Sequence, residues 1–331
     1  MKSMSSQLIS VVVVTAGIKD YINFCLDSLK KQTFPNLEIL VIDNSLNPNF
    51  SREIKECHPN IRLYSSPKNL FYCAALNKGV EMSKGDFILC LNDDVILDRG
   101  FIAEALKGFS IDERIGMVSG KILRSDDKTI DSTGLFLSIW RTAKERAYGL
   151  KDKGQYEKEE YIFGVNGAVA FYRRKMLEDI KIDTDYFDTD YRIFYEDLDI
   201  AWRARNLGWK TYYVPQAIAY HVRGATVRKS FGIDKLYARR YLSNNLNFDL
   251  VKNRYLTLIK NESYLDLVLH LPFILFYDFL VWSYILFFKP SLIKDFISNL
   301  RYLKPAFKKR SLVKKRKLGY IYGVGKYKTL S

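Results

Sequence analysis

Residues 87–95 read Phe87-Ile88-Leu89-Cys90-Leu91-Asn92-Asp93-Asp94-Val95, an apolar run that ends in an amide and two adjacent carboxylates. The run predicts a buried β-strand. Carboxylates beside such a strand must be solvated, hydrogen-bonded or neutralised by a cation. Because ligand crevices form at the carboxyl ends of strands in open α/β sheets, this strand end is the first candidate for a metal and phosphate site. A solvated acidic turn is the alternative for these residues taken alone.

Outward from this strand, apolar strands alternate with amphipathic helices. Strands are predicted at 8–14, 37–42, 61–64 and 115–123, and helices at 20–31, 51–57, 71–82 and 101–109. The alternation implies right-handed crossovers and a largely parallel sheet. A continuous run such as Val11-Val12-Val13-Val14 implies burial on both faces of that sheet. Residues 124–160 are polar with little periodicity and predict a surface excursion or flexible loop. Residues 161–172 are strand-like around 164–168.

Composition excludes some classes of protein. With 331 residues and 48% hydrophobic content, the chain can form one large packed domain or two smaller ones. Its four cysteines include no CxxC pair, which argues against a zinc cluster and fits reduced thiols in a cytosolic compartment. The apolar run at 8–14 is short and lacks a small-residue cleavage pattern, so we expect a first strand rather than an export signal.

The charge of +15 is concentrated near the C-terminus, where residues 301–331 contain eleven Lys or Arg and no acid. Composition changes after about residue 232, and residues 264–288 are almost continuously apolar except for Asp266, His270, Pro272 and Asp278. These polar residues favour a helix in the membrane interface over a simple span. A helix docked on the rest of the protein is the alternative. The cations at 308–310 and 314–317 favour anionic lipid over nucleic acid, for which no motif is present.

Three other positions are candidates for chemistry. A helix is predicted from near Glu196 to Gly208 and opens with Glu196-Asp197, immediately after Phe194-Tyr195. Capping of that helix is one explanation, but aromatic shielding would also raise a carboxylate's pKa and make it a useful base. His221 follows a strand-like segment at 210–214 and could be structural or a metal ligand.

Asp43 closes a strand and is placed to accept hydrogen bonds from a nucleotide base, although a turn-forming Asp-Asn pair is the ordinary alternative. The glycine-rich phosphate loops of dinucleotide-binding proteins and P-loop nucleotidases are both absent from the sequence.

In combination, these pieces resemble the inverting family 2 glycosyltransferases of the GT-A fold, especially their rhamnosyltransferase-like branch, over residues 8–224. A family segment, Asn-x-Gly-[Phe/Tyr]-x-x-[Ala/Gly]-x-Asn-x-Gly, is similar to Asn69-Leu70-Phe71-Tyr72-Cys73-Ala74-Ala75-Leu76-Asn77-Lys78-Gly79, with Phe71 replacing the usual glycine. The family's DxD-type motif corresponds to Asn92-Asp93-Asp94, with asparagine at its first position.

The resemblance implies a role for each matching residue. Asp197 would be the general base, and Asp94 and His221 would hold Mg²⁺ or Mn²⁺. The residues expected to bind the nucleoside-diphosphate sugar are Thr15, Asp43, Asn69, Asn77, Asp93, Gly167, Glu196, Trp202 and Arg203.

The implied architecture is an α/β GT-A domain at 1–232, with a mostly parallel central sheet flanked by helices, and a helical, membrane-associated extension at 233–331. The expected activity is transfer of a sugar, from dTDP-rhamnose or a UDP-hexose for example, to a hydroxyl of a glycan or lipid-linked glycan in cell-surface polysaccharide synthesis. A polyprenyl-phosphate sugar transferase and a non-catalytic sugar-binding protein are the alternatives. We expect the protein in the cytoplasm, bound peripherally to the inner face of the cell membrane, with no nucleic-acid partner.

Overall fold

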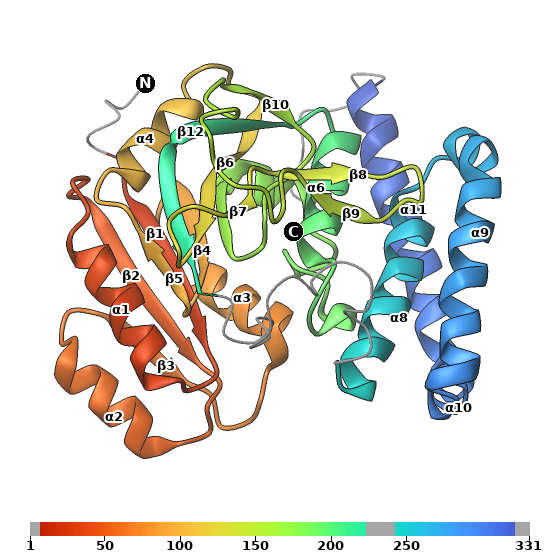
Figure 1. The fold of residues 1–331 in the computed structure, drawn as a ribbon, viewed down its shortest axis with the longest axis horizontal. Helices are drawn as coiled ribbons and strands as arrows, with labels where there is room; N and C mark the ends of the chain where they lie inside the picture. Colours follow the sequence, from red (N-terminus) through yellow and green to blue (C-terminus); the bar gives the residue numbers. More distant parts are fainter. Residues whose placement is uncertain (1–6, 223–241, 322–331) are drawn as a thin grey trace.

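The computed structural model describes residues 7–222 and 242–321. Its centre is a ten-stranded sheet in the order β10-β12-β6-β11-β4-β1-β2-β3, with β5 paired to β12 and β7 to β6 (Figure 1). Strands β3, β2, β1 and β4 are mutually parallel. Their bounds are β1 Ile9–Thr15, β2 Leu37–Asp43, β3 Arg62–Ser65 and β4 Phe87–Asn92. The expected α/β class with a mostly parallel centre is confirmed.

The other half of the sheet mixes directions. Strand β11 is antiparallel to both β4 and β6, whereas β12 is parallel to β6. The short strand β5 pairs with the end of β12, which places His221 opposite Val95, next to Asp94. The bounds here are β5 Val95–Leu97, β6 Ile115–Arg124, β7 Ile130–Ser132, β10 Glu160–Ile162, β11 Val169–Arg173 and β12 Lys210–His221.

Helices cover both faces of the sheet, as the continuous valine run predicts. Val11 and Val13 belong to one core cluster with residues of α1, α2 and α4, while Val12 and Val14 belong to a second with residues of α3, α5 and α6. Burying each such side chain contributes about 1.5–3 kcal/mol to the free energy of unfolding. Both faces of β1 are packed in this way. The bounds are α1 Lys19–Lys30, α2 Pro48–Cys57, α3 Phe71–Met82, α4 Phe101–Gly108, α5 Arg174–Ile180 and α6 Glu196–Asn206.

Two expectations for the middle of the chain are wrong. The region 124–160, expected to be a surface excursion or flexible loop, contains regular structure: β7 and a separate hairpin of β8 (Leu135–Leu137) and β9 (Ala143–Glu145). It also buries Asp131, Ser132 and Thr133 completely. Because these buried residues are polar and are satisfied by hydrogen bonds, the region shows no hydrophobic periodicity although it is folded. The strand expected around 164–168 is instead the connection between β10 and β11.

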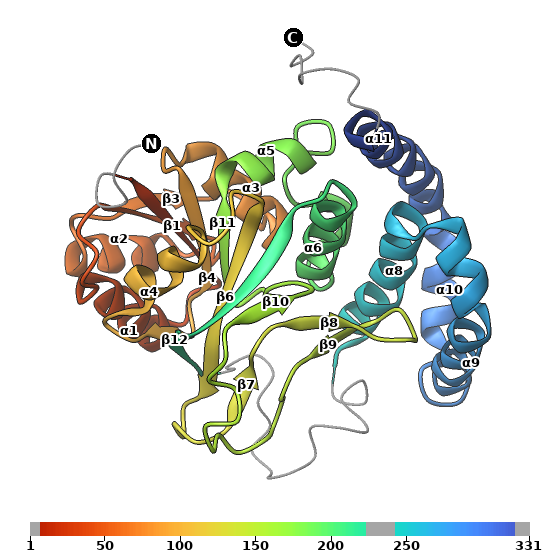
Figure 2. The same ribbon diagram turned by 90° about the horizontal axis from the view of Figure 1, so that it is seen from above.

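The C-terminal helices form a layer beside α6 (Figures 1 and 2). Helix α8 (Asn244–Asn261) packs against α6, and α9 (Tyr264–Phe288), α10 (Ser291–Ser298) and α11 (Leu303–Ile321) lie farther from the sheet. The 3₁₀ turns η2 (Thr189–Tyr191) and η3 (Leu300–Tyr302) precede α6 and α11. Helix α9 is long and apolar enough to cross a membrane, and most of its side chains are exposed. The expected boundary at 232/233 lies outside the described residues.

Buried ion pairs fasten this layer to the α/β region. Lys260 Nζ of α8 lies 2.5 Å from Asp188 Oδ2 and 3.0 Å from Asp199 Oδ1. Lys309 Nζ of α11 lies 2.5 Å from Asp188 Oδ1. Arg310, 9% exposed, donates to the carbonyl oxygen of Ile259. Of the cations at 308–310 expected to attract anionic lipid, Lys309 and Arg310 instead dock α11 on its neighbours.

Candidate active site

The parallel strands end at one edge of the sheet, where they bring separate polar residues together. In the strand register, Thr15 lies beside Asp43, and Val14 lies beside Asn92. Thr15 Oγ1 donates a 2.6 Å hydrogen bond to Asp93 Oδ2 across the ends of β1 and β4. A cavity of about 550 Å³ opens at this edge, within the usual size of a small-molecule site.

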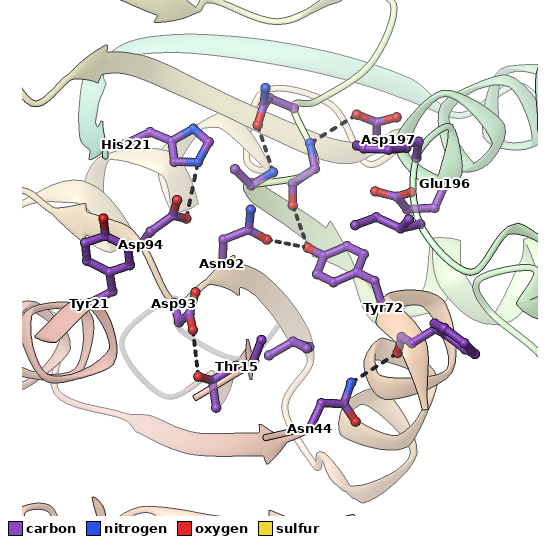
Figure 3. Close-up of a pocket in the computed structure, with 18 of the residues that line it drawn as sticks. Thr15, Tyr21, Asn44, Tyr72, Asn92, Asp93, Asp94, Glu196, Asp197 and His221 are labelled. Carbon is purple, nitrogen blue, oxygen red and sulfur yellow. Dashed lines mark hydrogen bonds and ion pairs between the residues drawn. The ribbon is translucent and has the colours of Figure 1, made fainter. Parts of the chain in front are cut away.

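Asp93 and Asp94 line the cavity at the end of β4 (Figure 3). Burial raises the pKa of Asp93 to about 6; the hydrogen bond from Thr15 opposes this shift and the neighbouring Asp94 carboxylate adds to it. A nearby cation would stabilise the ionised form of a carboxylate in this environment.

His221 faces Asp94 from the end of β12. Its Nε2 lies 3.3 Å from Asp94 Oδ1, and its Nδ1 lies 2.9 Å from Asp131 Oδ2. Burial acts to lower the pKa of His221, but its hydrogen bonds to Asp131 and Asp94 outweigh burial and raise it. Asp131 is completely buried and fixes the orientation of the imidazole ring, so that Nε2 points toward Asp94 (Figure 3).

These residues fit a divalent cation. A carboxylate and an imidazole nitrogen meet from two different strands, and a second carboxylate orients the imidazole, as is usual for metal-binding histidines. Within residues 7–222 and 242–321, no three His, Cys, Asp or Glu side chains form a metal-binding group. A cation here would therefore need oxygens from a ligand such as a diphosphate to complete its coordination.

Glu196 and Asp197 open α6 on another wall of the cavity. The Asp197 carboxylate accepts hydrogen bonds from the Leu198 N–H at 2.7 Å and the Gly167 N–H at 3.3 Å. Burial raises the pKa of both carboxylates, and for Glu196 the neighbouring Asp197 charge adds to this effect. Among the described residues, Glu196 Oε2 is a buried oxygen without a hydrogen-bond partner, which suits a ligand that donates a hydroxyl.

The pair Asp93 and Asp94 and the pair Glu196 and Asp197 lie on opposite sides of the cavity (Figure 3). Between them, Tyr72 Oη donates to Asn92 Oδ1 at 2.8 Å, and it also lies 3.1 Å from the Gly167 carbonyl oxygen. Tyr72 thus joins the end of β4 to the loop beside Asp197. A ligand that spans the cavity would meet the Asp94–His221 pair at one end and Asp197 at the other.

A family model described as "Glycosyl transferase family 2" matches residues 10–181, just over half of the chain. The chain belongs to this family. The family predicted from the motifs is thereby confirmed, and with it glycosyltransferase activity.

Two relatives illustrate the range of the family. The amylovoran biosynthesis glycosyltransferase AmsB of Erwinia amylovora is 26% identical over 225 residues, covering 64% of this chain and 69% of that protein. The N-acetylglucosaminyl-diphospho-decaprenol L-rhamnosyltransferase of Mycobacterium tuberculosis is 24% identical over 238 residues, covering 65% of this chain and 76% of that protein.

A solved structure of similar fold is the mannosyltransferase PcManGT from Pyrobaculum calidifontis in complex with GDP-Man and Mn²⁺. Its TM-score is 0.53 with 16% sequence identity, and the match covers 96% of this chain and 88% of that one. At this identity the likeness concerns the fold, and it confirms the GT-A architecture expected from the sequence.

The fold brings most of the predicted family 2 site residues to one cavity. Those that line it are Thr15, Asn69, Asp93, Asp94, Gly167, Glu196, Asp197 and His221. Asn69 also accepts a 2.7 Å hydrogen bond from the Phe71 N–H, which shapes the turn where glycine is usual in the family. Phe71 adopts a φ of 58° there, so the backbone keeps a conformation that glycine would favour.

Four predicted donor-binding residues do not line the cavity. Asp43 accepts hydrogen bonds from Ser45 N and Ser51 Oγ. Asn77 binds the backbone of 186–187, and Trp202 packs against Leu258 and other apolar residues. Arg203, 1% exposed, donates to Asp199 and to the carbonyl oxygens of Ile180 and Tyr186. Their observed contacts stabilise the loops and helices that surround the cavity, and none of the four side chains lines its interior.

Sequence reasoning missed three contributors to the site. Tyr72 lies inside the recognised 69–79 segment, so its aromatic hydroxyl was a usable signal. Asp131 and Glu145 come from the poorly periodic region 124–160; Glu145 lines the cavity and accepts a 2.6 Å hydrogen bond from Asn166. No periodic pattern or motif marks either acid.

Proposed function

We propose that this chain transfers a sugar from a nucleoside-diphosphate sugar to an acceptor hydroxyl and inverts the anomeric configuration in one displacement. The observation that carries the proposal is the placement of Asp94 with His221 and of Asp197 on opposite sides of one cavity (Figure 3). A single displacement needs a base on one side of the sugar and charge stabilisation at the leaving group on the other.

Asp94 and His221 would hold Mg²⁺ or Mn²⁺, and the solved PcManGT complex with GDP-Man and Mn²⁺ supports this choice of ligand. When bound, such a cation neutralises the negative charge that develops on the departing diphosphate. Asp131 keeps the Nε2 atom of His221 directed at the site. Asp93, held by Thr15, is positioned to contact the ribose or a sugar hydroxyl.

Asp197 would accept the proton of the attacking hydroxyl. Its raised pKa makes it a stronger base than an ordinary aspartate, and the N–H groups of Gly167 and Leu198 hold its oxygens in place. Glu196, with its unpartnered buried oxygen, would accept a hydrogen bond from a sugar hydroxyl. Donor recognition would extend to Asn69 at the cavity wall.

For the acceptor, we propose a glycan or lipid-linked glycan in cell-surface polysaccharide synthesis. Support comes from the relatives, one of which acts in amylovoran biosynthesis while the other is named for an N-acetylglucosaminyl-diphospho-decaprenol. The cavity wall includes apolar Leu242, just before α8, and Leu246 in its first turn, so the C-terminal layer contributes to the binding site.

The test is incubation with a panel of sugar nucleotides and Mg²⁺ or Mn²⁺, scored for nucleoside-diphosphate release with and without a lipid-linked glycan acceptor. Asp94→Ala should weaken donor binding only when the metal is present, and chelation of the metal should do the same to the unaltered chain. Donor affinity indifferent to both changes would refute the metal assignment. Transfer to polyprenyl phosphate alone would favour that alternative, and donor binding without turnover would indicate a sugar-binding protein.

We also propose that the outer helices bind an anionic membrane surface, at the cytoplasmic side if the acceptor is lipid-linked. The exposed side chains of α9 are almost all apolar, and exposed apolar residues continue along the chain to Phe307. Among the side chains that the structure describes, up to residue 314, exposed cations of the same layer lie at Lys294, Arg301, Lys304 and Lys308. Cations beside an apolar surface are attracted to anionic lipid by about 1 kcal/mol each.

Co-sedimentation with vesicles tests this surface. Binding should be stronger to vesicles of phosphatidylcholine with phosphatidylglycerol than to phosphatidylcholine alone, and Lys304→Glu/Lys308→Glu should weaken it. Lys153→Glu/Lys158→Glu changes the net charge equally at exposed positions of the α/β region and should not. Equal loss in both double variants, or self-association of the chain without lipid binding, would refute a specific membrane surface.

A further inference from the structure

The segment that leads into the catalytic base has an unusual backbone. Arg192, Phe194 and Tyr195 have φ values of 60°, 71° and 71°, although none is glycine. Such conformations persist only where surrounding contacts over-determine them, and they cluster at functional sites. Tyr195 is the residue immediately before α6, so its conformation sets the direction in which Glu196 and Asp197 leave the segment.

One side chain of α8 holds this segment. The Nδ2 atom of Asn253 lies 2.9, 2.7 and 2.8 Å from the carbonyl oxygens of Tyr191, Ile193 and Phe194. Asn253 is completely buried, so water cannot replace these hydrogen bonds. The two Nδ2 hydrogens are shared among these three carbonyl oxygens, which lie on either side of Arg192 and between Phe194 and Tyr195.

Neighbouring side chains of α8 reinforce the same segment. Lys252 Nζ donates to the carbonyl oxygen of Asp190 at 2.6 Å, and Asp249 pairs with the Arg192 guanidinium at 2.8 Å. Each of these contacts joins the C-terminal layer to residues 190–194. Residues 190 and 191 end the 3₁₀ turn η2, and residues 192–194 belong to no helix or strand. Helix α8 therefore supplies the side-chain contacts of the segment, in addition to its internal Ile193 N–H to Tyr191 carbonyl hydrogen bond and the hydrogen bond that the Cys73 N–H of α3 donates to the Arg192 carbonyl.

We propose that Asn253 is a positioning residue that holds the 191–195 segment, in which Arg192, Phe194 and Tyr195 have positive φ, and thereby aims Asp197 at the acceptor hydroxyl. This inference rests on the proposed role of Asp197 as the base. Asn253 itself touches the backbone of the segment and does not line the cavity. Its effect should therefore fall mainly on the rate of transfer, because the proposed metal and diphosphate contacts lie at the strand ends on the other side of the cavity, and Glu196 is the proposed donor contact that directly follows the segment.

Asn261→Ala is the matched control. Asn261 is an asparagine of the same helix, 5% exposed, and its Nδ2 donates to Asp199 Oδ1 at 2.8 Å and to the Thr257 carbonyl at 3.1 Å, with no bond to residues 191–195. Both alanine variants remove a buried amide, so both should lower the melting temperature. Only Asn253→Ala should release the segment.

Two measurements on the full chain test the proposal. Asn253→Ala should lower kcat at least about tenfold, while donor affinity changes by no more than about twofold. Asn261→Ala should retain kcat within about threefold of the unaltered chain. Asn253→Ser keeps one hydroxyl donor and should give an intermediate kcat; it replaces the alanine variant if that variant does not fold. Hydrogen exchange at the amides of 191–195 should accelerate in Asn253→Ala and not in Asn261→Ala.

Each outcome decides between the two proposals. An equal kcat in the two alanine variants, or parallel loss of kcat and donor affinity in Asn253→Ala, overturns the positioning role. Failure of the unaltered chain to release nucleoside diphosphate from any donor counts against the proposed function instead. In that case hydrogen exchange still decides, because unchanged exchange at 191–195 in Asn253→Ala overturns the positioning role without any activity measurement.

Discussion

Asp197→Asn should separate catalysis from stability. Asparagine has nearly the same shape, and its Oδ1 can still accept the 2.7 Å hydrogen bond from the Leu198 N–H, whereas its NH₂ group cannot accept the 3.3 Å hydrogen bond from the Gly167 N–H. It cannot accept the proton of the acceptor hydroxyl. General-base catalysis contributes about 10²–10⁴ in rate, and the loss corresponds to about 3–5 kcal/mol at the transition state. Donor affinity should change little.

The same substitution should stabilise the fold. Burial raises the pKa of Asp197, so the folded state disfavours the ionised form. For such a carboxylate, stability falls as pH rises from its unfolded pKa through its higher folded pKa, and the deficit is fully present above both. Each unit of pKa difference corresponds to about 1.4 kcal/mol of unfolding free energy. In a large domain, each kcal/mol shifts the melting temperature by about 2 °C. Asp197→Asn should therefore melt higher at neutral pH, because the contact that it gives up, the 3.3 Å hydrogen bond from the Gly167 N–H, is the longer of the two.

Asp199→Asn provides a control of opposite sign on the same helix. Burial acts to raise the pKa of Asp199, but Arg203 and Lys260 outweigh it and lower the pKa. Removing that charge leaves two buried cations short of a partner, so this variant should melt lower. The assays are nucleoside-diphosphate release, donor titration calorimetry and thermal melts at pH 7.5. Undiminished turnover in Asp197→Asn would refute the base assignment, and a lower melting temperature for it would refute the electrostatic argument.

Three further outcomes are expected. Transfer by the unaltered chain should decline on the acid side with an apparent pKa above 3.8, the ordinary aspartate value, because the base must be ionised and its pKa is raised; a pH profile of kcat that stays level down to pH 4 would contradict this. Lys309→Met removes a cation from two carboxylates and should cost about 1–3 kcal/mol in denaturant unfolding, whereas exposed Lys308→Met should be neutral. Gly79→Ala would place a Cβ atom 2.2 Å from Val12 Cγ1 and should destabilise by about 1–3 kcal/mol; Gly100→Ala, whose nearest contact is 3.6 Å, is the control in the same unfolding assay.

The part of the site that sequence predicts well is the part built by regular strands. The ends of β1 and β4 carry Thr15, Asp93 and Asp94, and the parallel register brings them to one edge as the alternating pattern implies. His221 was predicted by its motif position. It pairs with Val95 of β5, an antiparallel strand of three residues that is too short to leave a periodic signal in the sequence.

The rest depends on long-range contacts of polar residues. Arg203 follows the Glu196-Asp197 motif closely in sequence, yet helical geometry turns it away from the cavity and toward Asp199 one turn earlier. Asp131 reaches His221 from 90 residues away, out of a region with no hydrophobic period. Lys309 belongs to a basic run that is typical of a solvated tail, and only the fold reveals its carboxylate partners.

The packing of α8 bears on how this chain can be divided. Its buried face includes Asn253, Thr257 and Lys260, each bonded to a residue between 188 and 199. Deleting everything after residue 222 would leave the Asp188 and Asp199 carboxylates without their lysine and would expose apolar side chains of α6 to water. We therefore expect a truncated α/β fragment to aggregate on expression, so that any soluble, minimal version of this enzyme must retain the helix through Asn261.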